Sequence, residues 1–339
     1  MNEFYEIEPS IENYWRSIIL FGRNVASYKF ALAKSLYDLK DSSNDVIKLE
    51  ELAKPYVKHL LEHLSHSPKQ ITSKSSTFLS ACEQYNKNDI SYDELISKAT
   101  KLGFSNVIDA FHNVHSKEIG KRFFIDERKE SGGIRITDDF YKLSNEFNFD
   151  DLNLETEARW RLVETGWSLG ISRQLIDVQY DDTTKEFFMD DKERRINITS
   201  SRDSLNGYQK GKCFYCFDNV SISSKDENLA DVDHFFPWIL NDKLQNVNGV
   251  WNLVLSCKNC NRGESGKFER LPTLELLARL YKRNEYLINS HLPLKETLIN
   301  QTGKNGEQRQ LYLQSQYNIA KRNLIHTWEP LVIKGIITF

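Results

Sequence analysis

The sequence predicts an α+β protein that is predominantly α-helical. Segments with apolar residues at helical spacing start at capping residues in the first 170 residues and again after residue 270. Short apolar runs separated by turn residues lie between them, and two Cys-x-x-Cys pairs enclose two more such runs. A chain of 339 residues has room for about two domains. We predict a mainly helical domain with small β-hairpins at residues 1–195 and a second domain at residues 196–339 that ends in helices.

Capping residues mark the first helices. Ser10 can cap an amphipathic helix, and Ser91 with Glu94 forms a capping box that opens another helix, which Gly103 can close. The apolar side of the first helix is expected to consist of Ile11, Trp15, Ile18, Ile19 and Val25.

Two further helices are expected in the N-terminal region. One covers about residues 45–65 and is interrupted by Pro55, which fits a kink or a boundary. The other covers residues 154–169 and is closed by Gly170. Its tryptophans at helical spacing are expected in the core rather than on a base-stacking surface: Trp160 and Trp167.

Three histidines at helical spacing, His59, His63 and His66, could suggest a metal site in the 45–65 segment. On a helical wheel they project nearly opposite the apolar face of that segment. We therefore expect them to face solvent and predict no metal site there. The apolar face consists of Val57, Leu60, Leu61 and Leu64.

Two groups of strands are expected. The first is a hairpin that joins residues 122–125 to 134–137 around a Gly-Gly loop. The second joins residues 176–180 to 187–189 across a polar turn, and residues 195–199 add a third strand. A helix capped by Ser200 or Ser201 then leads to the first cysteine pair.

The two Cys-x-x-Cys pairs predict a structural zinc site. A tetrahedral Zn²⁺ is satisfied by four thiolates, and a two-residue spacer lets both sulfurs of a pair reach one ion. Two disulfides are the alternative, but the N-terminus shows no apolar signal segment and a fifth cysteine, Cys82, is left over. The four predicted zinc ligands are Cys213, Cys216, Cys257 and Cys260.

The segment between the pairs carries Asp233-His234 followed by an apolar run that Pro237 ends. A polar connection then leads to a second apolar run that starts at Asn252-Leu253. The chain from Cys257 onward can open a short helix that contains Asn261. Two strands and a helix are therefore expected around one metal.

On these motifs, residues 213–267 resemble the HNH endonuclease domain, the ββα-metal nuclease fold. The match comprises Cys-x-x-Cys, Asp233-His234, Asn252 and Cys-x-x-Cys-Asn261, and covers about one sixth of the chain. Asn261 stands where the family name has its last histidine, which is the pattern of HNN members of the family. The resemblance implies a metal-dependent endonuclease that hydrolyses phosphodiester bonds of DNA.

The resemblance assigns a role to each of these residues. It implies that His234 is the general base, for which an unperturbed pKa near neutrality is suitable. Asp233 and Asn261 are implied oxygen ligands of one catalytic divalent cation, Mg²⁺ or Mn²⁺. Asn252 would brace the loop that aims His234.

Basic residues near Asn261 are candidates for contacts with flanking phosphates: Lys258, Arg262 and Lys267. Arg262 and Lys267 could equally be solvated helix residues. Asp231 could assist the metal, but we expect a polar residue at the edge of a strand.

Helices are expected again over residues 274–286, which Thr273 can cap, and over residues 307–328. Exposed cations on these helices could extend the phosphate-binding surface. They are Arg279, Lys282 and Arg283 on the first helix, and Arg309, Lys321 and Arg322 on the second.

The charge of the chain is unevenly distributed. Residues 201–339 carry 18 Lys and Arg against 14 Asp and Glu, a net charge of +4, which leaves −7 for residues 1–200. The acidic region is therefore a poor candidate for the main nucleic-acid grip. It either forms an ordinary solvated surface or binds a protein partner or a regulatory ligand. The absence of long apolar runs favours a cytoplasmic protein without membrane spans.

Two other functions are compatible with the sequence. A non-catalytic zinc ribbon that binds nucleic acid or protein would need zinc but not Mg²⁺. The nuclease could also be a dormant subunit of a bacterial anti-phage or restriction system, with the N-terminal region as its regulator. The sequence does not distinguish DNA from RNA, or single strands from duplexes.

Overall fold

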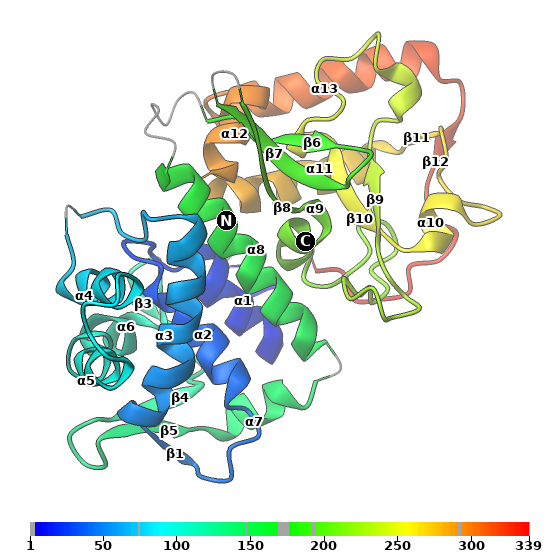
Figure 1. Ribbon diagram of the computed structural model, residues 1–339. Coiled ribbons are helices and arrows are strands. Elements are labelled where there is room, and N and C mark those ends of the chain that lie inside the picture. The colour runs from blue at the N-terminus through cyan, green and yellow to red at the C-terminus, as the bar shows by residue number, and fades with distance from the viewer. Residues whose placement is uncertain are drawn as a thin grey trace. The chain divides into compact units, whose positions relative to one another are not determined.

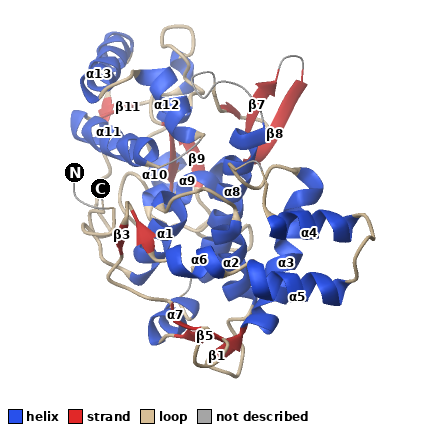
Figure 2. Ribbon diagram, turned by 90° about the vertical axis from the view of Figure 1, so that its left-hand side faces the viewer, coloured by secondary structure: helices blue, strands red, loops and turns tan. Residues whose placement is uncertain are grey.

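The computed structural model describes residues 4–73, 75–146, 148–168, 176–191, 194–290 and 293–338 (Figure 1). The chain divides into two compact units, the N-terminal unit (Pro9–Gly170) and the C-terminal unit (Met1–Glu8 with Ile171–Phe339). About 49% of the residues are helical and 15% lie in strands of small sheets (Figure 2). The predicted α+β fold with mainly helical content is therefore confirmed.

The described residues of the N-terminal unit form mainly helices and two small sheets. Helix α2 packs against α3 and α8, and α3 packs against α5. The helices are α1 (Ile11–Phe21), α2 (Tyr28–Asp38), α3 (Leu49–His66), α4 (Thr77–Asn86), α5 (Tyr92–Leu102), α6 (Ser105–Ala110), α7 (Asp138–Ser144) and α8 (Phe149–Ser168). The strands are β1 (Val46–Lys48), β2 (Asn113–Val114), β3 (Lys117–Glu118), β4 (Phe124–Glu127) and β5 (Gly133–Ile136).

Local capping signals place the helix starts as expected. The side chain of Ser10 accepts a hydrogen bond from the backbone of Asn13, and Ser91 forms the predicted capping box with Glu94. The first helix ends at Phe21, however, so Val25 lies outside it and is exposed, contrary to expectation. The predicted end of α8 at Leu169 and Gly170 lies outside the described residues.

Pro55 neither ends nor divides its helix. Helix α3 begins at Leu49 and continues through Pro55 to His66. The lost backbone hydrogen bond is tolerated because Leu52, Tyr56 and Leu60, on both sides of the proline, are fully buried in the core. Packing of this face therefore outweighs the local preference for a break.

Two of the three histidines on α3 are buried, so the expectation that all face solvent was wrong. Only His66 is exposed. His59 contacts Asp38 with its Nε2 at 2.8 Å. The ring of His63 stacks on Trp160 with centroids 3.5 Å apart, and its Nδ1 lies 2.9 Å from a carboxylate oxygen of Glu164. A helical wheel considers one helix alone, whereas Trp160 and Glu164 come from α8.

The predicted hairpin of this unit is confirmed as β4 and β5, which pair antiparallel. Strand β1 adds to the other edge of β5 and completes a three-stranded sheet in the order β1-β5-β4. Gly133 lies close to the backbone of β1, since an added Cβ would stand 2.1 Å from the carbonyl oxygen of Ile47. The sheet therefore requires glycine at this position.

The C-terminal unit contains the cysteine pairs. Its strands are β6 (Gln179–Asp181), β7 (Glu186–Asp191), β8 (Arg194–Ser200), β9 (Asp231–His234), β10 (Leu253–Ser256), β11 (Leu271–Pro272) and β12 (Thr327–Trp328). Its α-helices are α9 (Ser201–Asn206), α10 (Lys258–Arg262), α11 (Leu274–Asn289), α12 (Leu294–Thr302) and α13 (Gly306–Asn323). Short 3₁₀ turns are η2 (Gly207–Gln209), η3 (Trp238–Leu240) and η4 (Val250–Asn252).

Along the sequence, the division between the two units falls after residue 170, whereas the expected boundary was near residue 195. Strands β6, β7 and β8 form the expected antiparallel meander, but it belongs to the C-terminal unit. The segment leading into β6 is held by α12: the backbone N–H of Val178 donates to Thr297 Oγ1 at 2.9 Å, and Asn300 donates to the carbonyl of Ile176 at 3.0 Å. Helix α12 was not predicted, so this attachment could not be foreseen.

Three of the six basic residues predicted as exposed cations on the later helices are instead engaged within the unit. Arg283 is fully buried, and Arg279 donates to the carbonyls of Phe214 and Tyr215. Arg309 on α13 forms a buried ion pair with Glu285. These three arginines make contacts that hold the unit together. The other three predicted cations are exposed as expected: Lys282, Lys321 and Arg322. The last predicted helix also ends earlier, at Asn323, before β12.

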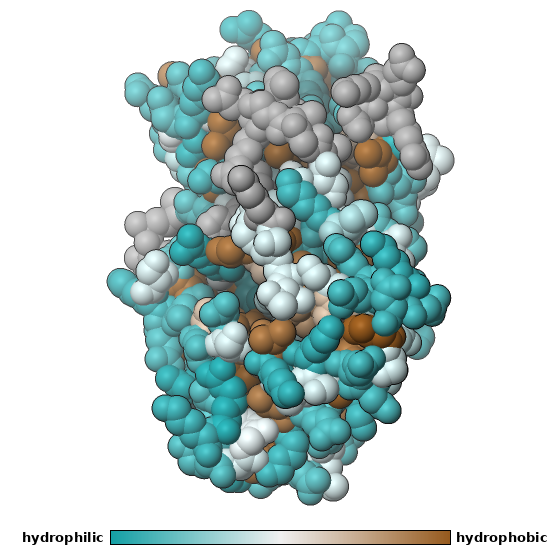
Figure 3. Space-filling view, turned by 60° about the vertical axis from the view of Figure 1, so that its left-hand side comes forward, coloured by the Kyte–Doolittle hydropathy of each residue, from teal (hydrophilic) through white to brown (hydrophobic). Residues whose placement is uncertain are grey.

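On the face drawn in Figure 3, hydrophilic side chains cover most of the area and hydrophobic ones gather in small separate groups. Within the described part of the chain, no helix combines the length and apolar content needed to cross a membrane.

Candidate functional site

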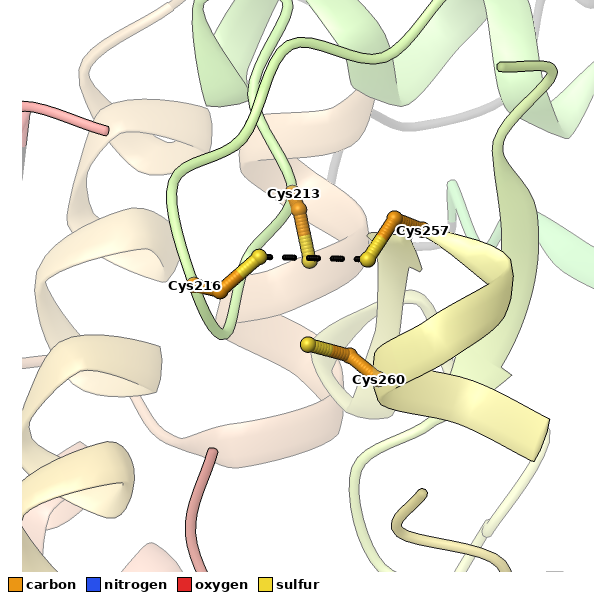
Figure 4. Close-up of side chains that lie close together, drawn as sticks. All are labelled: Cys213, Cys216, Cys257 and Cys260. Atoms are coloured by element: carbon orange, nitrogen blue, oxygen red, sulfur yellow. Dashed lines mark hydrogen bonds between the residues drawn. The ribbon is translucent and has the colours of Figure 1, made fainter. Parts of the chain in front are cut away.

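The four cysteines of the two pairs come together in the C-terminal unit. Their sulfur atoms all lie within 4.8 Å of one another and point toward a common centre (Figure 4). The Sγ atoms of Cys216 and Cys257 are 3.8 Å apart, which is the edge of a tetrahedron with Zn–S bonds of about 2.3 Å. A disulfide requires about 2.05 Å, and all four thiols are free. The cysteines could therefore bind a metal such as zinc.

Each cysteine pair is shaped by a tight local structure. The first pair is a turn in which the N–H of Phe217 donates to the carbonyl of Cys213, with Phe217 at φ 60°. In the second pair, Cys257 directly precedes α10 and Cys260 lies within it. Hydrogen bonds among the four thiols lower the pKa of Cys257 and raise that of Cys260.

The segment that contains Lys334 and Gly335, near the C-terminus, is hydrogen-bonded to the first cysteine pair. The backbone N–H groups of Lys334 and Gly335 both donate to the carbonyl of Cys216, at 2.8 and 3.2 Å. An added Cβ at Gly335 would stand 1.9 Å from the carbonyl oxygen of Phe217. Only glycine permits this close approach.

The predicted strand, strand and helix occur next to the cysteine cluster. Strands β9 and β10 pair antiparallel with Asp233 opposite Val254 and His234 opposite Leu253. Helix α10 follows β10 directly and packs against β9. Asp233, His234 and Asn261 are thereby carried by adjacent elements.

Asp233 is buried and both of its carboxylate oxygens are engaged. Tyr215, from within the first cysteine pair, donates its hydroxyl to Oδ2 at 2.6 Å. Lys267 donates its Nζ to Oδ1 at 3.1 Å. Lys267 is 1% exposed, so it lies in the interior rather than on the surface where a phosphate contact was expected.

His234 is oriented by an amide. Its Nε2 lies 2.8 Å from Oδ1 of Asn248, and its ring lies against those of Tyr180 and Trp238. Burial lowers the pKa of His234, although the contact with Asn248 and the charge of Asp233 oppose the shift. The imidazole is therefore neutral at neutral pH and can accept a proton.

Asn252 is fully buried and holds the loop that follows His234. Its Nδ2 donates to the carbonyls of Phe236 and Val247 at 3.1 and 2.9 Å, and its Oδ1 accepts the N–H of Phe236 at 2.8 Å. Phe236 lies two residues after His234, and Val247 directly precedes Asn248, the partner of its ring. This placement suits the bracing role that the resemblance implies.

Asp231 is the half-buried first residue of β9, a strand of a two-stranded sheet, and its side chain contacts α10. Its Oδ2 accepts a hydrogen bond from Nδ2 of Asn261 at 3.1 Å. The same oxygen forms an ion pair with Nε of Arg262 at 2.9 Å. Alternate residues of a strand share a face, which places Asp231 beside Asp233 on β9. Arg262 and Lys258 are both exposed, and Lys258 donates to the carbonyl of Glu227.

Tyr215 and Asn248 were not foreseen as part of the site. Tyr215 lies in the two-residue spacer of a cysteine pair, and Asn248 is one of several asparagines in a polar connection. No local sequence pattern indicates that Tyr215 contacts Asp233 or that Asn248 contacts His234, because each contact forms only when the chain is folded.

Comparisons with protein-family models, with curated proteins and with solved structures find no match for this chain. Within the described residues, the four cysteines form the one group of three or more His, Cys, Asp or Glu side chains whose ligand atoms lie so close together. The cysteine cluster is thus the best-defined feature of the site.

Proposed function

We propose that the C-terminal unit is a metal-dependent HNH endonuclease that hydrolyses phosphodiester bonds of DNA. The observation that supports this best is the unit of β9, β10 and α10 beside the cysteine cluster, with Asp233 and His234 on β9 and Asn261 on α10. In this proposal, zinc on the four cysteines is structural, because a site closed by four thiolates leaves no position for a substrate.

The catalytic cation, Mg²⁺ or Mn²⁺, would be held by Asp233 and Asn261. The donor set fits a hard cation, since Asp233 offers carboxylate oxygens and Asn261 an amide oxygen, with Asp231 next to both. A carboxylate has about four acceptor positions, and Tyr215 and Lys267 use two of those on Asp233. When bound, such a cation would neutralise charge on the scissile phosphate.

His234 is proposed as the general base. When Nε2–H is donated to the amide oxygen of Asn248, Nδ1 keeps the lone pair that accepts a proton from water. The lowered pKa keeps this lone pair available at neutral pH. Asn252 keeps the loop between His234 and Asn248 in place through its three hydrogen bonds.

DNA is the proposed substrate, and RNA remains a second nucleic acid to be tested. The exposed cations at the two ends of α10, Lys258 and Arg262, would contact flanking phosphates. Arg262 would have to leave its ion pair with Asp231 to do so. The N-terminal unit would provide targeting, a protein interface or a regulatory ligand site, as in an effector of a bacterial anti-phage or restriction system. We place this activity in the cytoplasm, where thiols remain reduced.

The test is nicking of supercoiled plasmid DNA with Mg²⁺ or Mn²⁺ by the wild type and by His234→Ala. Loss of a general base is expected to reduce cleavage about 10²- to 10⁴-fold. His326→Ala is the control, because His326 is exposed in the same unit. Equal cleavage by wild type and His234→Ala would refute the mechanism. DNA binding that needs zinc but neither Mg²⁺ nor Asp233 would instead favour a zinc-ribbon binding module.

A further inference from the structure

Tyr215 links the cysteine cluster to Asp233. It occupies the spacer between Cys213 and Cys216, and its side chain is completely buried. Its hydroxyl donates to Oδ2 of Asp233 at 2.6 Å, across 18 residues of sequence. A zinc knuckle needs no hydroxyl at this position, since its ligands are the two sulfurs.

The ring of Tyr215 is held rigidly. Its edge contacts with Phe214 and Trp328 have centroid separations of 5.1 and 5.0 Å. The carbonyl of Tyr215 accepts a hydrogen bond from Arg279 at 2.6 Å. Backbone and ring are thus fixed independently of Asp233, so the hydroxyl is pre-oriented toward the carboxylate.

Lys267, the second hydrogen-bond partner of Asp233, is also attached to a cysteine pair. Lys267, which donates to Oδ1, is itself held by a backbone hydrogen bond from its N–H to the carbonyl of Cys260 at 2.7 Å. The two oxygens of Asp233 are therefore bonded by Tyr215, which lies within the first cysteine pair, and by Lys267, whose backbone is hydrogen-bonded to the second pair. Their position depends on the geometry of the cluster.

We propose that Tyr215 is a positioning residue that transmits the geometry of the cysteine cluster to Asp233 and thereby sets the affinity for the catalytic cation. This inference rests on the proposed nuclease function, in which Asp233 is a cation ligand. Tyr215 contacts no substrate atom in this role. It restricts the carboxylate to one orientation and leaves the remaining acceptor positions for the cation.

The expected loss of cation affinity can be estimated from other metal sites, in which hydrogen bonds orient the carboxylates that bind the metal. Removing such a partner typically weakens metal affinity by about 10- to 100-fold. The neutral hydroxyl adds no charge that would compete with the cation, unlike the ammonium of Lys267. Loss of the hydroxyl should therefore weaken cation binding while leaving the four thiols intact.

The variant is Tyr215→Phe, which removes one oxygen and keeps the ring. Tyr208→Phe is the matched control, because Tyr208 is also buried in the C-terminal unit and donates its hydroxyl to Ser290 at 3.0 Å. Zinc content is measured by elemental analysis, and Mn²⁺ binding by calorimetry in the absence of DNA. The Mg²⁺ dependence of plasmid nicking is measured in parallel.

We expect Tyr215→Phe to keep one zinc ion per chain and to bind Mn²⁺ about 10- to 100-fold more weakly, with Tyr208→Phe like the wild type. Nicking by Tyr215→Phe should recover toward the wild-type rate at high Mg²⁺. Wild-type Mn²⁺ affinity in Tyr215→Phe overturns the inference. Loss of zinc overturns it as well, since the hydroxyl would then serve the knuckle rather than Asp233.

The outcomes separate this inference from the proposed function. If the wild type binds Mn²⁺ through Asp233, shown by loss of binding in Asp233→Asn, and Tyr215→Phe weakens it, the inference holds even if no DNA is cut. If His234→Ala abolishes cleavage but Tyr215→Phe binds Mn²⁺ normally, only the inference fails. Absence of Mn²⁺ binding in the wild type overturns the inference in either case.

Discussion

Replacing Asn252 by alanine should destabilise the C-terminal unit strongly. The side chain is fully buried and makes three hydrogen bonds of 2.8 to 3.1 Å to the backbone of Phe236 and Val247. Asn252→Ala leaves one N–H and two carbonyl groups without these partners, at a cost of about 1 kcal/mol each. The unfolding free energy should therefore fall by roughly 3 kcal/mol.

The assay is differential scanning calorimetry of the zinc-loaded protein. For a unit of about 180 residues, a loss of roughly 3 kcal/mol lowers Tm by about 6 to 12 °C. Asn259→Ala is the matched control, because Asn259 is exposed on α10 of the same unit. Its Tm should change by about 2 °C or less, as is usual for surface substitutions.

A second variant separates hydrogen bonding from volume. Asn252→Asp keeps the shape of the side chain and the acceptor for Phe236 N–H, but it places an oxygen against the carbonyls of Phe236 and Val247. It should destabilise at least as much as alanine at pH 7, because a buried charge faces two acceptors. The reasoning is wrong if either Asn252 variant melts within about 2 °C of Asn259→Ala.

Three further predictions concern the metal cluster and two buried charge pairs. The wild type should contain one zinc ion per chain, and Cys257→Ser should lose it and unfold the C-terminal unit; a zinc-free, stably folded variant would contradict this. Burial opposes protonation of His63, but the hydrogen bonds of His63 to Glu157 and Glu164 raise its pKa overall. The charged histidine therefore stabilises the fold fully below about pH 6.5, and this stabilisation is lost as the pH rises through the folded-state pKa. Chemical denaturation should accordingly show a larger loss for His63→Gln at pH 6 than at pH 9, and an equal loss would exclude the charged pair. Lys267→Met should cost about 3 kcal/mol by leaving Asp233 without its buried cation, and adding Asp233→Asn should recover most of that loss in the same measurement.

Local signals account for the elements that were predicted well. The capping box at Ser91, the N-cap at Ser10 and the Gly-Gly hairpin act over three or four residues, so the sequence contains the whole interaction. The cysteine cluster was also predictable, because only one kind of centre commonly satisfies two such pairs. Segments without local signals, such as α12, were missed.

Expectations that depended on a partner from another element were less successful. His63 was assigned to the surface from its own helix, whereas Glu164, 101 residues away, makes its burial possible. Lys267 was expected to bind phosphate, but its ion pair with Asp233 joins residues 34 apart. Asp231 was expected as a polar residue at a strand edge, and its contacts with Asn261 and Arg262 of α10 could not be foreseen.

The sequence by itself determined the helical character of the chain, the four cysteines that could bind a metal, and the Asp233-His234 pair in the segment between them. Residue type and short spacing are sufficient for these, because helix caps, strand pairing across short turns and thiolate chelation are local. Only the tertiary structure decided that Tyr215 and Lys267 orient Asp233, that Asn248 holds His234, and that two histidines of α3 are buried. A buried polar group must find its partner wherever packing brings one, and that choice is made by the fold as a whole.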